Sequence, residues 1–360
     1  MPAVSNNGII FKAIPEGIPQ PDVHFELIHR TIDIENLKLG KNDFILRNLY
    51  LSLDPYIRTT LREPHSESFL PPQRIGHVIS GLGVSEVIKS NDHNHKVGDL
   101  VYGFIGWEEY THIKTDENRI NCAPFKNINY HKKLLPEIPL SIQLSAFQLS
   151  GLTAYGSLMA LGKPKAGETI YISSAAGATG QLVGQIAKIK GMKVIGSTGS
   201  DEKVDYLLNE LKFDAAFNYK KVDLDKTLSK LCPNGIDIYF ENVGGETLEV
   251  VLNHCNRLAR IPVCGMISQY NITDPNGKYG VKNLELIFHK SICVHGFLMS
   301  DFYGTQTEKD FDKDMLEWVK SGKIVCKENI TVGIENVVNG FIDMLVGNSV
   351  GKSIVKISDY

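Results

Sequence analysis

The feature that most constrains the fold is an apolar run that leads into a glycine-rich turn and then into an amphipathic stretch. It occupies residues 169–184 and reads TIYISSAAGATGQLVG. The short apolar run predicts a buried strand, and the period of the residues after the turn predicts a helix. A buried strand that runs directly into a helix is the repeating element of a parallel sheet covered by helices on both faces.

The same alternation continues through the middle of the chain. Apolar runs predict six strands, at residues 169–173, 193–198, 215–218, 236–240, 260–264 and 292–297. Helical patterns such as residues 181–190 and 204–211 lie between them. Strands that alternate with helices indicate βαβ units. We therefore predict an α/β fold in which a Rossmann domain carries a six-stranded parallel sheet.

The residues before about 135 have a different texture, with short β-rich segments such as residues 44–51, 83–88 and 97–103. A length of 360 residues is sufficient for two domains. We predict a β-rich domain over residues 1–140 and the Rossmann domain over residues 141–303. Residues 304–360 contain two more helical patterns and a last strand, and we expect them to return to the first domain.

Composition argues against several classes of partner and location. The chain has 38 basic and 41 acidic side chains, a net charge of −3, and no long run of like charge. This balance argues against nucleic acid or an anionic membrane as a partner. The uncharged residues 138–162 are long enough to cross a bilayer, but they contain a proline, two glutamines and several serines, so we predict a buried helix.

The termini and the cysteines indicate a cytoplasmic protein. The N-terminal residues lack the basic start and apolar core of a signal peptide. The six cysteines, at positions 122, 232, 255, 264, 293 and 326, form no CxxC pair and no tight cluster. We therefore expect reduced thiols rather than a disulfide scaffold.

The glycine-rich turn predicts a dinucleotide site. A pyrophosphate approaches backbone amides at a helix N-terminus when the turn carries no side chains, and Gly177 and Gly180 meet that need. Gly184 lets the helix lie close to the sheet. The first glycine of the usual GxGxxG pattern is Ala175 here, and the alternative is an ordinary strand-to-helix turn.

The end of the second strand favours NADP over NAD. An acidic residue there would hold the ribose hydroxyls of NAD, whereas this chain has Gly199 and Ser200, followed by Asp201, Glu202 and Lys203. An uncharged strand end with a lysine just beyond it suits a 2′-phosphate. The alternative is that Ser200 only caps the next helix and Lys203 is a surface residue.

The cysteine and histidine positions predict no metal. No cysteine precedes Cys122 and none lies between Cys122 and Cys232, and His77 has no acidic or cysteine neighbour. His93 and His95 lie beside Asp92, in a composition typical of a hydrated loop. A catalytic zinc needs three protein ligands, so we expect metal-free chemistry.

Ten motifs together resemble a known family. They are LSLDPYIR (51–58), GDLVYG (98–103), GWEEY (106–110), GLTAY (151–155), AAGATG (175–180), GSDEK (199–203), FNYK (217–220), ENVGG (241–245), GMISQYN (265–271) and GKSIVK (351–356). In order and over nearly the whole chain, they resemble the zinc-independent medium-chain dehydrogenase/reductase superfamily. Within it they resemble the NADPH-dependent leukotriene B4 dehydrogenase/prostaglandin reductase and alkenal double-bond reductase family.

The resemblance implies a GroES-like catalytic domain, a Rossmann domain, NADP(H) in the cleft between them, and a homodimer. It implies that Lys203 and Tyr219 contact the 2′-phosphate, that the loops at 242–244 and 265–270 surround the ribose and nicotinamide, and that residues 297–299 hold the carboxamide. The residues expected to bind the cofactor are Ala176, Gly177, Ala178, Thr179, Gly180, Gly199, Ser200, Lys203, Tyr219, Asn242, Val243, Cys264, Gly265, Ile267, Tyr270, Phe297, Leu298 and Met299.

Three residues are catalytic candidates: Tyr56, Tyr270 and His289. Tyr56 matches a position that faces the substrate in the plant enzymes of the family. His289 stands where relatives commonly have a tyrosine beside the nicotinamide ribose, and a histidine also donates protons near neutral pH. The alternative is that His289 is a surface residue and water supplies the proton. Leu82 lies near a position where plant relatives have a pocket tyrosine, which argues against phenylpropanoid substrates.

The leading functional hypothesis is NADPH-dependent reduction of the carbon–carbon double bond of α,β-unsaturated aldehydes and ketones, by hydride transfer to the β-carbon. This activity needs alignment and hydrogen-bond donors rather than a metal. One alternative is an NADPH quinone oxidoreductase of the same superfamily. An alternative of another class is a non-catalytic NADPH-binding sensor or structural protein, because a Rossmann fold alone does not establish catalysis.

Overall fold

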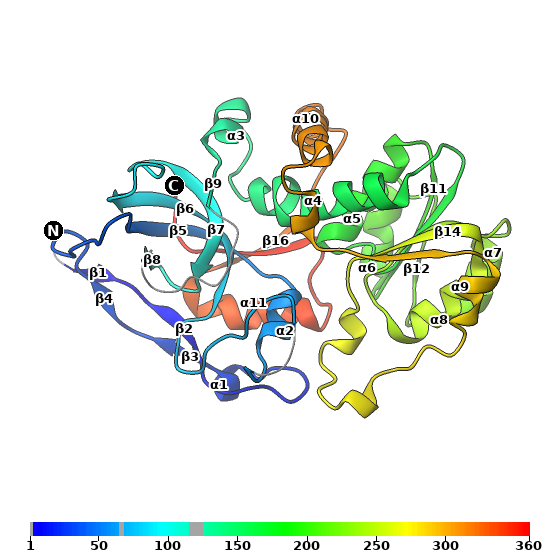
Figure 1. Cartoon of the computed structure of the whole chain (residues 1–360), viewed down its shortest axis with the longest axis horizontal. Coiled ribbons are helices and arrows are strands. Elements are labelled where there is room, and N and C mark those ends of the chain that lie inside the picture. Colours follow the sequence, from blue (N-terminus) through cyan, green and yellow to red (C-terminus); the bar gives the residue numbers. More distant parts are fainter. Residues whose placement is uncertain (1–2, 65–67, 115–124) are drawn as a thin grey trace. The chain divides into compact units, whose positions relative to one another are not determined.

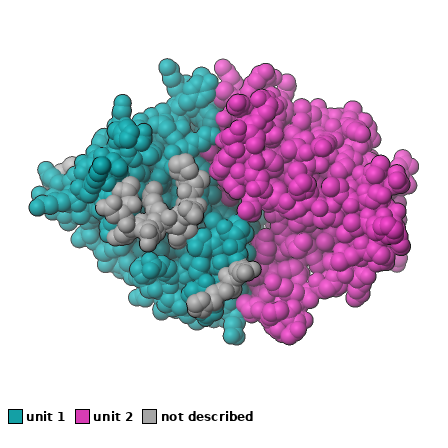
Figure 2. Space-filling model, in the orientation of Figure 1, with its two compact units in different colours: residues 1–144, 328–349, 353–360 teal, residues 145–327, 350–352 magenta. Residues whose placement is uncertain are grey.

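The computed structural model describes residues 3–64, 68–114 and 125–360 (Figure 1). These residues divide into two compact units, shown in different colours in Figure 2. The first unit comprises residues 1–144, 328–349 and 353–360, and the second comprises residues 145–327 and 350–352. Cys122 lies outside the described residues.

The second unit is built on a six-stranded parallel sheet, which confirms the predicted Rossmann architecture. Its strand order is β12-β11-β10-β13-β14-β15. The strands are β10 (Thr169–Ile172), β11 (Lys193–Thr198), β12 (Ala215–Asn218), β13 (Ile236–Phe240), β14 (Cys255–Val263) and β15 (Cys293–Gly296). All four residues of β10 are buried, as expected for a central strand covered on both faces.

Helices precede, connect or follow these strands. They are α4 (Leu149–Gly156), α5 (Ala178–Ile189), α6 (Asp201–Asp205), α7 (Leu224–Leu231), α8 (Gly245–His254), α9 (Glu285–His289) and α10 (Gln306–Lys320). The side chains of Tyr171 and Tyr239 stack across neighbouring strands, with ring centroids 5.3 Å apart. Both rings are fully buried in the apolar core of this unit.

The uncharged residues 138–162 contain α4, a buried helix as predicted. Seven of its eight residues are buried. No helix in the described part of the chain is long and apolar enough to cross a membrane.

Residues 304–327 differ from the predicted domain boundaries. We expected the chain to return to the first domain at residue 304, but α10 lies in the second unit. The hydroxyl of Tyr155, on α4, donates to Asp314 at 2.7 Å, and the rings of Tyr155 and Phe311 lie 5.7 Å apart. A Cβ at Gly151 would come within 3.0 Å of Phe311, so the two helices pack closely. The apolar face of α10 therefore completes the second unit, and the chain returns only at residue 328.

The first unit is β-rich. Its seven-stranded sheet contains β5 (Phe44–Ser52), β6 (Ser80–Ser90), β7 (Leu100–Gly106), β8 (Tyr110–Ile113), β9 (Lys126–Asn127), β16 (Glu328–Val332) and β17 (Lys352–Lys356). Two antiparallel pairs accompany it, β1 (Val4–Ser5) with β4 (Thr31–Ile32) and β2 (Gly8–Phe11) with β3 (Phe25–Ile28). Its helices are α1 (Pro21–His24), α2 (Tyr56–Thr60), α3 (Asn129–Leu134) and α11 (Val337–Leu345).

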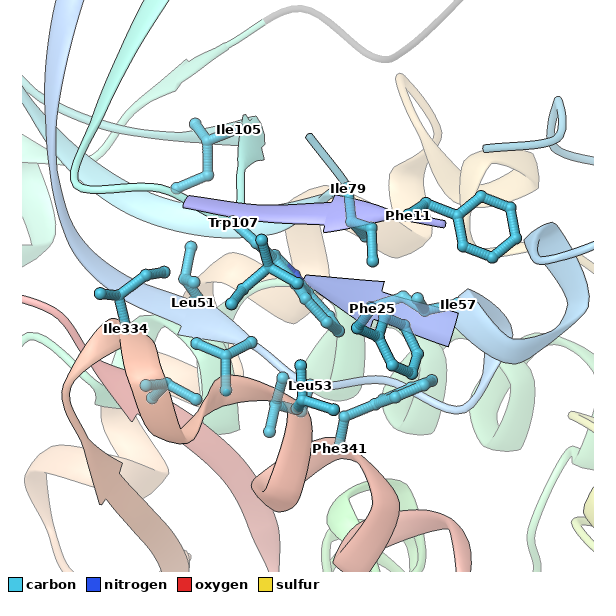
Figure 3. Packing of buried hydrophobic residues seen from close by; sticks show 14 of the residues in the cluster. Phe11, Phe25, Leu51, Leu53, Ile57, Ile79, Ile105, Trp107, Ile334 and Phe341 are labelled. Carbon is cyan, nitrogen blue, oxygen red and sulfur yellow. The ribbon is translucent and has the colours of Figure 1, made fainter. Parts of the chain in front are cut away.

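Aromatic side chains form the centre of the first unit's core. Trp107 and Phe341 are fully buried, with ring centroids 5.5 Å apart at an angle of 70°. Phe25 meets Phe341 edge-on at 6.5 Å. Figure 3 shows Phe341 on α11 pointing toward Trp107 and Phe25, so that the last long helix closes the core formed by strands from the N-terminal half of the chain.

Candidate cofactor and active site

The predicted cofactor residues of the second unit lie in segments that follow the strands of its parallel sheet. Residues 173–180 follow β10, residues 199–203 follow β11, and Tyr219 follows β12. Residues 241–244 follow β13, residues 264–270 follow β14, and residues 297–299 follow β15. In a parallel sheet these carboxyl ends share one edge, which is where ligands of open α/β sheets bind.

The glycine-rich turn presents the N-terminus of α5. Gly177 is the N-cap residue, and the first helical hydrogen bond joins the Gln181 amide to the Gly177 carbonyl at 3.0 Å. The amides of residues 178–180 precede that bond, so they belong to the group that a helix leaves for external acceptors. A Cβ at Gly180 would lie 2.6 Å from the carbonyl oxygen of Ser174. Glycine is therefore required at 180, and the turn fits an anionic ligand.

Packing around this turn explains both a departure from the usual pattern and the role of Gly184. Ala175 stands in place of the first glycine, and the opposing residue on β11 is Gly196, where a Cβ would lie 2.7 Å from the Ala175 methyl. Gly196 therefore leaves room for the methyl group of Ala175. A Cβ at Gly184 would lie 2.0 Å from the ring of Phe213, and Gly196 also lies against that ring. Gly184 therefore makes room for Phe213, which packs between α5 and β11.

The end of β11 combines a capped helix with a basic surface. The Ser200 hydroxyl accepts the Lys203 amide at 3.3 Å, so Ser200 caps α6, as the alternative interpretation expected. The other half of that interpretation, a surface position for Lys203, is wrong. Lys203 is buried apart from 8% of its surface, and burial, followed by the charge of Lys220, lowers the pKa of its ammonium. The ring of Tyr219 lies over Gly199, with its hydroxyl 3.5 Å from where a Cβ would be.

The loop after β13 is held by a buried polar network. The Asn242 side chain donates to the Ser173 carbonyl at 2.7 Å, and its amide donates to the Ser173 hydroxyl at 3.1 Å. Oε1 of the fully buried Glu241 accepts the amides of Val243 and Gly244 at 2.6 and 2.9 Å, and the Tyr239 hydroxyl at 2.7 Å. Burial raises the pKa of the Glu241 carboxyl. These bonds fix Asn242 beside the end of β10.

Backbone hydrogen bonds join the loop after β14 to the loop after β13. The Cys264 amide donates to the Glu241 carbonyl at 2.9 Å, and the Ile267 amide donates to the Asn242 carbonyl at 3.0 Å. The Tyr270 hydroxyl accepts the Met266 amide at 3.2 Å and lies 2.7 Å from where a Cβ at Gly265 would be. Burial raises the pKa of Tyr270, so its hydroxyl keeps its proton at neutral pH.

Two predicted groups remain: residues 297–299, which follow β15, and His289, which lies on α9. Phe297 packs on Phe302, with ring centroids 5.7 Å apart, and the Leu298 amide donates to Asp301 at 2.8 Å, so Met299 begins a short turn of 3₁₀ helix. His289 is the last residue of α9 and is exposed. Its contact is the tilted ring of Phe288 at 5.4 Å, and its role as a proton donor stays a prediction.

Tyr56 belongs to the first unit, where it lines a pocket of about 210 Å³. The walls combine aromatic and aliphatic groups with a few polar ones: Tyr56, Thr60, Leu70, Pro71, Pro72, Gln73, Arg74, His77, Val78, Ser80 and Phe104. Gln73 and Ser80 hold two segments of the wall together. The Gln73 side chain donates to the Ser80 carbonyl at 2.9 Å and accepts the Ser80 amide at 3.1 Å. The ring of Tyr56 meets Phe104 at 6.5 Å.

Two polar residues important to this geometry were not selected by the sequence analysis. Ser173 and Glu241 hold Asn242 and its loop, and each directly follows a buried strand, β10 or β13. A polar residue at the carboxyl end of an apolar run was the available signal. The sequence could not give their mutual contact, which joins strands 68 residues apart.

Comparison with known proteins identifies the family. Residues 7–120 match the family described as N-terminal domain of oxidoreductase, and residues 178–321 match the family described as zinc-binding dehydrogenase. The chain is 40% identical to the 2-alkenal reductase (NADP⁺-dependent) of Nicotiana tabacum over 99% of this chain and 98% of the relative. It is 39% identical to prostaglandin reductase 1 of Sus scrofa over 94% of this chain and 95% of the relative.

A solved structure decides the cofactor. CurA from Vibrio vulnificus, in complex with NADPH, matches with a TM-score of 0.86 and 34% identity over 98% of this chain and all of CurA. The protein is a zinc-independent medium-chain dehydrogenase/reductase. It is an NADP-dependent oxidoreductase with a Rossmann unit and a GroES-like unit. This confirms the predicted family, fold and cofactor.

One of the two family descriptions contains the word zinc, and the described residues do not contain a set of ligands for such an ion. Within residues 3–64, 68–114 and 125–360, no three histidine, cysteine or acidic side chains gather in a way that could hold a metal ion. The imidazoles of His95 and His93 lie 2.7 and 3.6 Å from the carboxylate of Asp92, and the His95 ring also stacks on Phe44 at 4.6 Å. A catalytic zinc site needs at least three such ligands.

Proposed function

We propose that this oxidoreductase reduces the carbon–carbon double bond of α,β-unsaturated aldehydes and ketones with NADPH. The observation that carries the proposal is the hydrogen-bonded pair of loops at 241–244 and 264–270, which holds the protonated hydroxyl of Tyr270 at the carboxyl edge of the sheet. The relatives named 2-alkenal reductase and prostaglandin reductase 1, matched over nearly the whole chain, support the same substrate class.

The chemistry divides between the cofactor and the protein. NADPH, when bound, supplies a hydride for the β-carbon of the conjugated substrate. The negative charge then develops on the carbonyl oxygen, and the protein's task is to stabilise that oxygen with donors and to return a proton to the α-carbon. Tyr270 is the donor that the geometry supports best, because its hydroxyl is fixed by the Met266 amide and stays protonated. Tyr56 and His289 are the other candidate donors.

The proposed cofactor residues have distinct tasks. The amides at the start of α5, in the turn that contains Gly177 and Gly180, donate hydrogen bonds to the pyrophosphate, and Lys203 and Tyr219 donate to the 2′-phosphate. Asn242, Val243, Cys264, Gly265, Ile267 and Tyr270 surround the ribose and nicotinamide. The pocket around Tyr56 receives the substrate's apolar part, because aromatic and aliphatic side chains form most of its wall.

Product analysis tests the proposal. The purified protein is mixed with NADPH and 4-hydroxynonenal, and the product is identified by mass spectrometry. We expect the saturated aldehyde. An allylic alcohol would indicate a carbonyl reductase instead, and turnover of quinones without turnover of enones would favour the quinone oxidoreductase alternative. Tight NADPH binding with no turnover of any enone, quinone or ketone would favour a sensor or structural role.

We also propose that two copies pair along β15, giving a homodimer in the cytoplasm. All four residues of β15 are exposed, and β15 is the last strand in the order of its sheet. Leu258, Phe288 and Val294 are exposed apolar side chains on or near this strand. An exposed edge pairs readily with an identical strand.

The five described cysteines are free thiols, which supports a reducing compartment.

The sedimentation coefficient tests the dimer. Wild-type protein should sediment as a dimer, and Val294→Lys should sediment as a monomer because it places a charge on the paired edge. Val97→Lys, at another exposed valine, is the control and should remain a dimer. A monomeric wild type, or a dimeric Val294→Lys variant, contradicts this interface.

A further inference from the structure

The side chains of Lys203, Tyr219 and Lys220 lie near one another where β11 ends. Lys220 lies outside the predicted set of cofactor residues. A Cβ on Gly199 would lie 3.4 Å from Cε of Lys220 and 3.5 Å from the Tyr219 hydroxyl. Both side chains therefore lie over the same residue at this strand end, within van der Waals reach of one point. The Lys220 amide donates to Oδ1 of Asn218 at 3.1 Å, which fixes the backbone that carries both residues.

The neighbouring lysine is used differently. Lys221 forms an ion pair with Asp201, and Asp201 also accepts the side-chain amide of Asn218 at 2.9 Å. These bonds lower the pKa of the Asp201 carboxyl. Lys220 forms no ion pair with any residue in the described ranges. The acidic residue closest in sequence to this strand end is thus already engaged, and the charge of Lys220 is left uncompensated.

Lys203 and Lys220 bring like charges together. Lys203 is buried, and burial followed by the charge of Lys220 lowers the pKa of its ammonium, while the charge of Glu202 acts in the opposite direction with a smaller effect. Two ammonium groups that repel each other disfavour the folded protein when nothing anionic lies between them. Such an arrangement is typical of a site for a doubly charged anion, which relieves the repulsion when it binds.

We propose that Lys220 is a second basic contact of the 2′-phosphate of NADP(H), and that it determines specificity for NADP over NAD together with Lys203. The inference rests on the proposed assignment of residues 199–203 and 219 to the 2′-phosphate. In this site Lys203 supplies a buried positive charge and Tyr219 supplies a hydroxyl donor. Lys220 supplies a second positive charge from an exposed position. Lys221 takes no part, because Asp201 holds it.

Binding of two nucleotide fragments isolates this contact from catalysis. Adenosine 2′,5′-bisphosphate carries the 2′-phosphate and 5′-ADP lacks it, and both are titrated into the protein by isothermal calorimetry. The variants are Lys220→Ala and the matched control Lys221→Ala, both at exposed positions. We expect Lys220→Ala to weaken the bisphosphate about tenfold, the size of one charge-assisted contact, and to leave 5′-ADP unchanged. Lys221→Ala should alter both affinities less than twofold.

A third variant separates failure of this inference from failure of the site assignment. If Lys203→Ala weakens the bisphosphate while Lys220→Ala behaves like Lys221→Ala, the Lys220 proposal is wrong and the site assignment holds. If neither Lys203→Ala nor Lys220→Ala discriminates between the two fragments, the 2′-phosphate lies elsewhere and both are wrong. Raising the salt concentration should weaken bisphosphate binding more in the wild type than in Lys220→Ala, because one fewer charge takes part.

Discussion

Replacement of Gly180 by alanine tests the glycine-rich turn. A Cβ at this position would lie 2.6 Å from the Ser174 carbonyl oxygen and 2.8 Å from both Cα and the carbonyl oxygen of Ala175. All three are backbone atoms of the turn, so the turn must move by roughly 0.8 Å to restore ordinary contact. Overpacking costs about 1–3 kcal/mol, and the better helix propensity of alanine offsets about 1 kcal/mol of it.

The larger effect should be on the cofactor. A shift of this size moves the amides of residues 178–180 away from the pyrophosphate, and misplacement by about 1 Å costs up to about 100-fold. We expect the NADPH dissociation constant, measured by fluorescence titration, to rise about 10- to 100-fold in Gly180→Ala.

Gly184→Ala is the matched control on the same helix. Its Cβ would meet the Phe213 ring at 2.0 Å rather than the turn, so the variant should lower the melting temperature while NADPH binding changes much less. The reasoning is refuted if Gly180→Ala binds NADPH as tightly as the wild type, or if Gly184→Ala weakens binding to the same extent.

Three further predictions concern single residues. Tyr270→Phe should lower kcat by about 100-fold, and an unchanged kcat excludes Tyr270 as the donor. Because burial raises the pKa of Tyr270, the wild-type kcat should show no alkaline loss from this group below about pH 10. Burial raises the pKa of Glu241 above its ordinary value of 4.5, so its contribution to stability is complete below that pH and is lost as pH rises through the folded-state pKa. The melting temperature of Glu241→Gln relative to wild type should therefore increase as pH rises above 4.5, and a constant difference contradicts this. Phe341→Ala should lower the free energy of unfolding of the first unit by about 3–5 kcal/mol in urea titrations, and a loss under 1 kcal/mol would mean that this ring is not central to the core.

The inner strands of the second unit, such as β10, were predictable because they are covered on both faces. Such strands are continuous apolar runs, and β10 is buried at every position. The polar and glycine residues just after each run then indicated the ligand edge, since parallel strands end together. The roles of Gly177, Gly180 and Ser200 were also predictable, because turns and helix caps depend on residues close in sequence.

Contacts between segments distant in sequence were not predictable. The contact of Ala175 with Gly196, and the place of Phe213 against Gly184, depend on which segments become neighbours. The wrong boundary at residue 304 has the same origin, because the amphipathic pattern of α10 shows that it packs but not on which unit. Lys220 escaped selection because its neighbour Lys221 has the same side chain, and only the ion pair with Asp201 distinguishes them.

The central claim is that hydride reaches the β-carbon of a conjugated carbonyl substrate. The most direct measurement uses NADPH deuterated at C4 with a 2-alkenal, followed by location of the label in the product by NMR. The account predicts a saturated aldehyde with deuterium at C3. Deuterium on the carbonyl carbon of an allylic alcohol would contradict it.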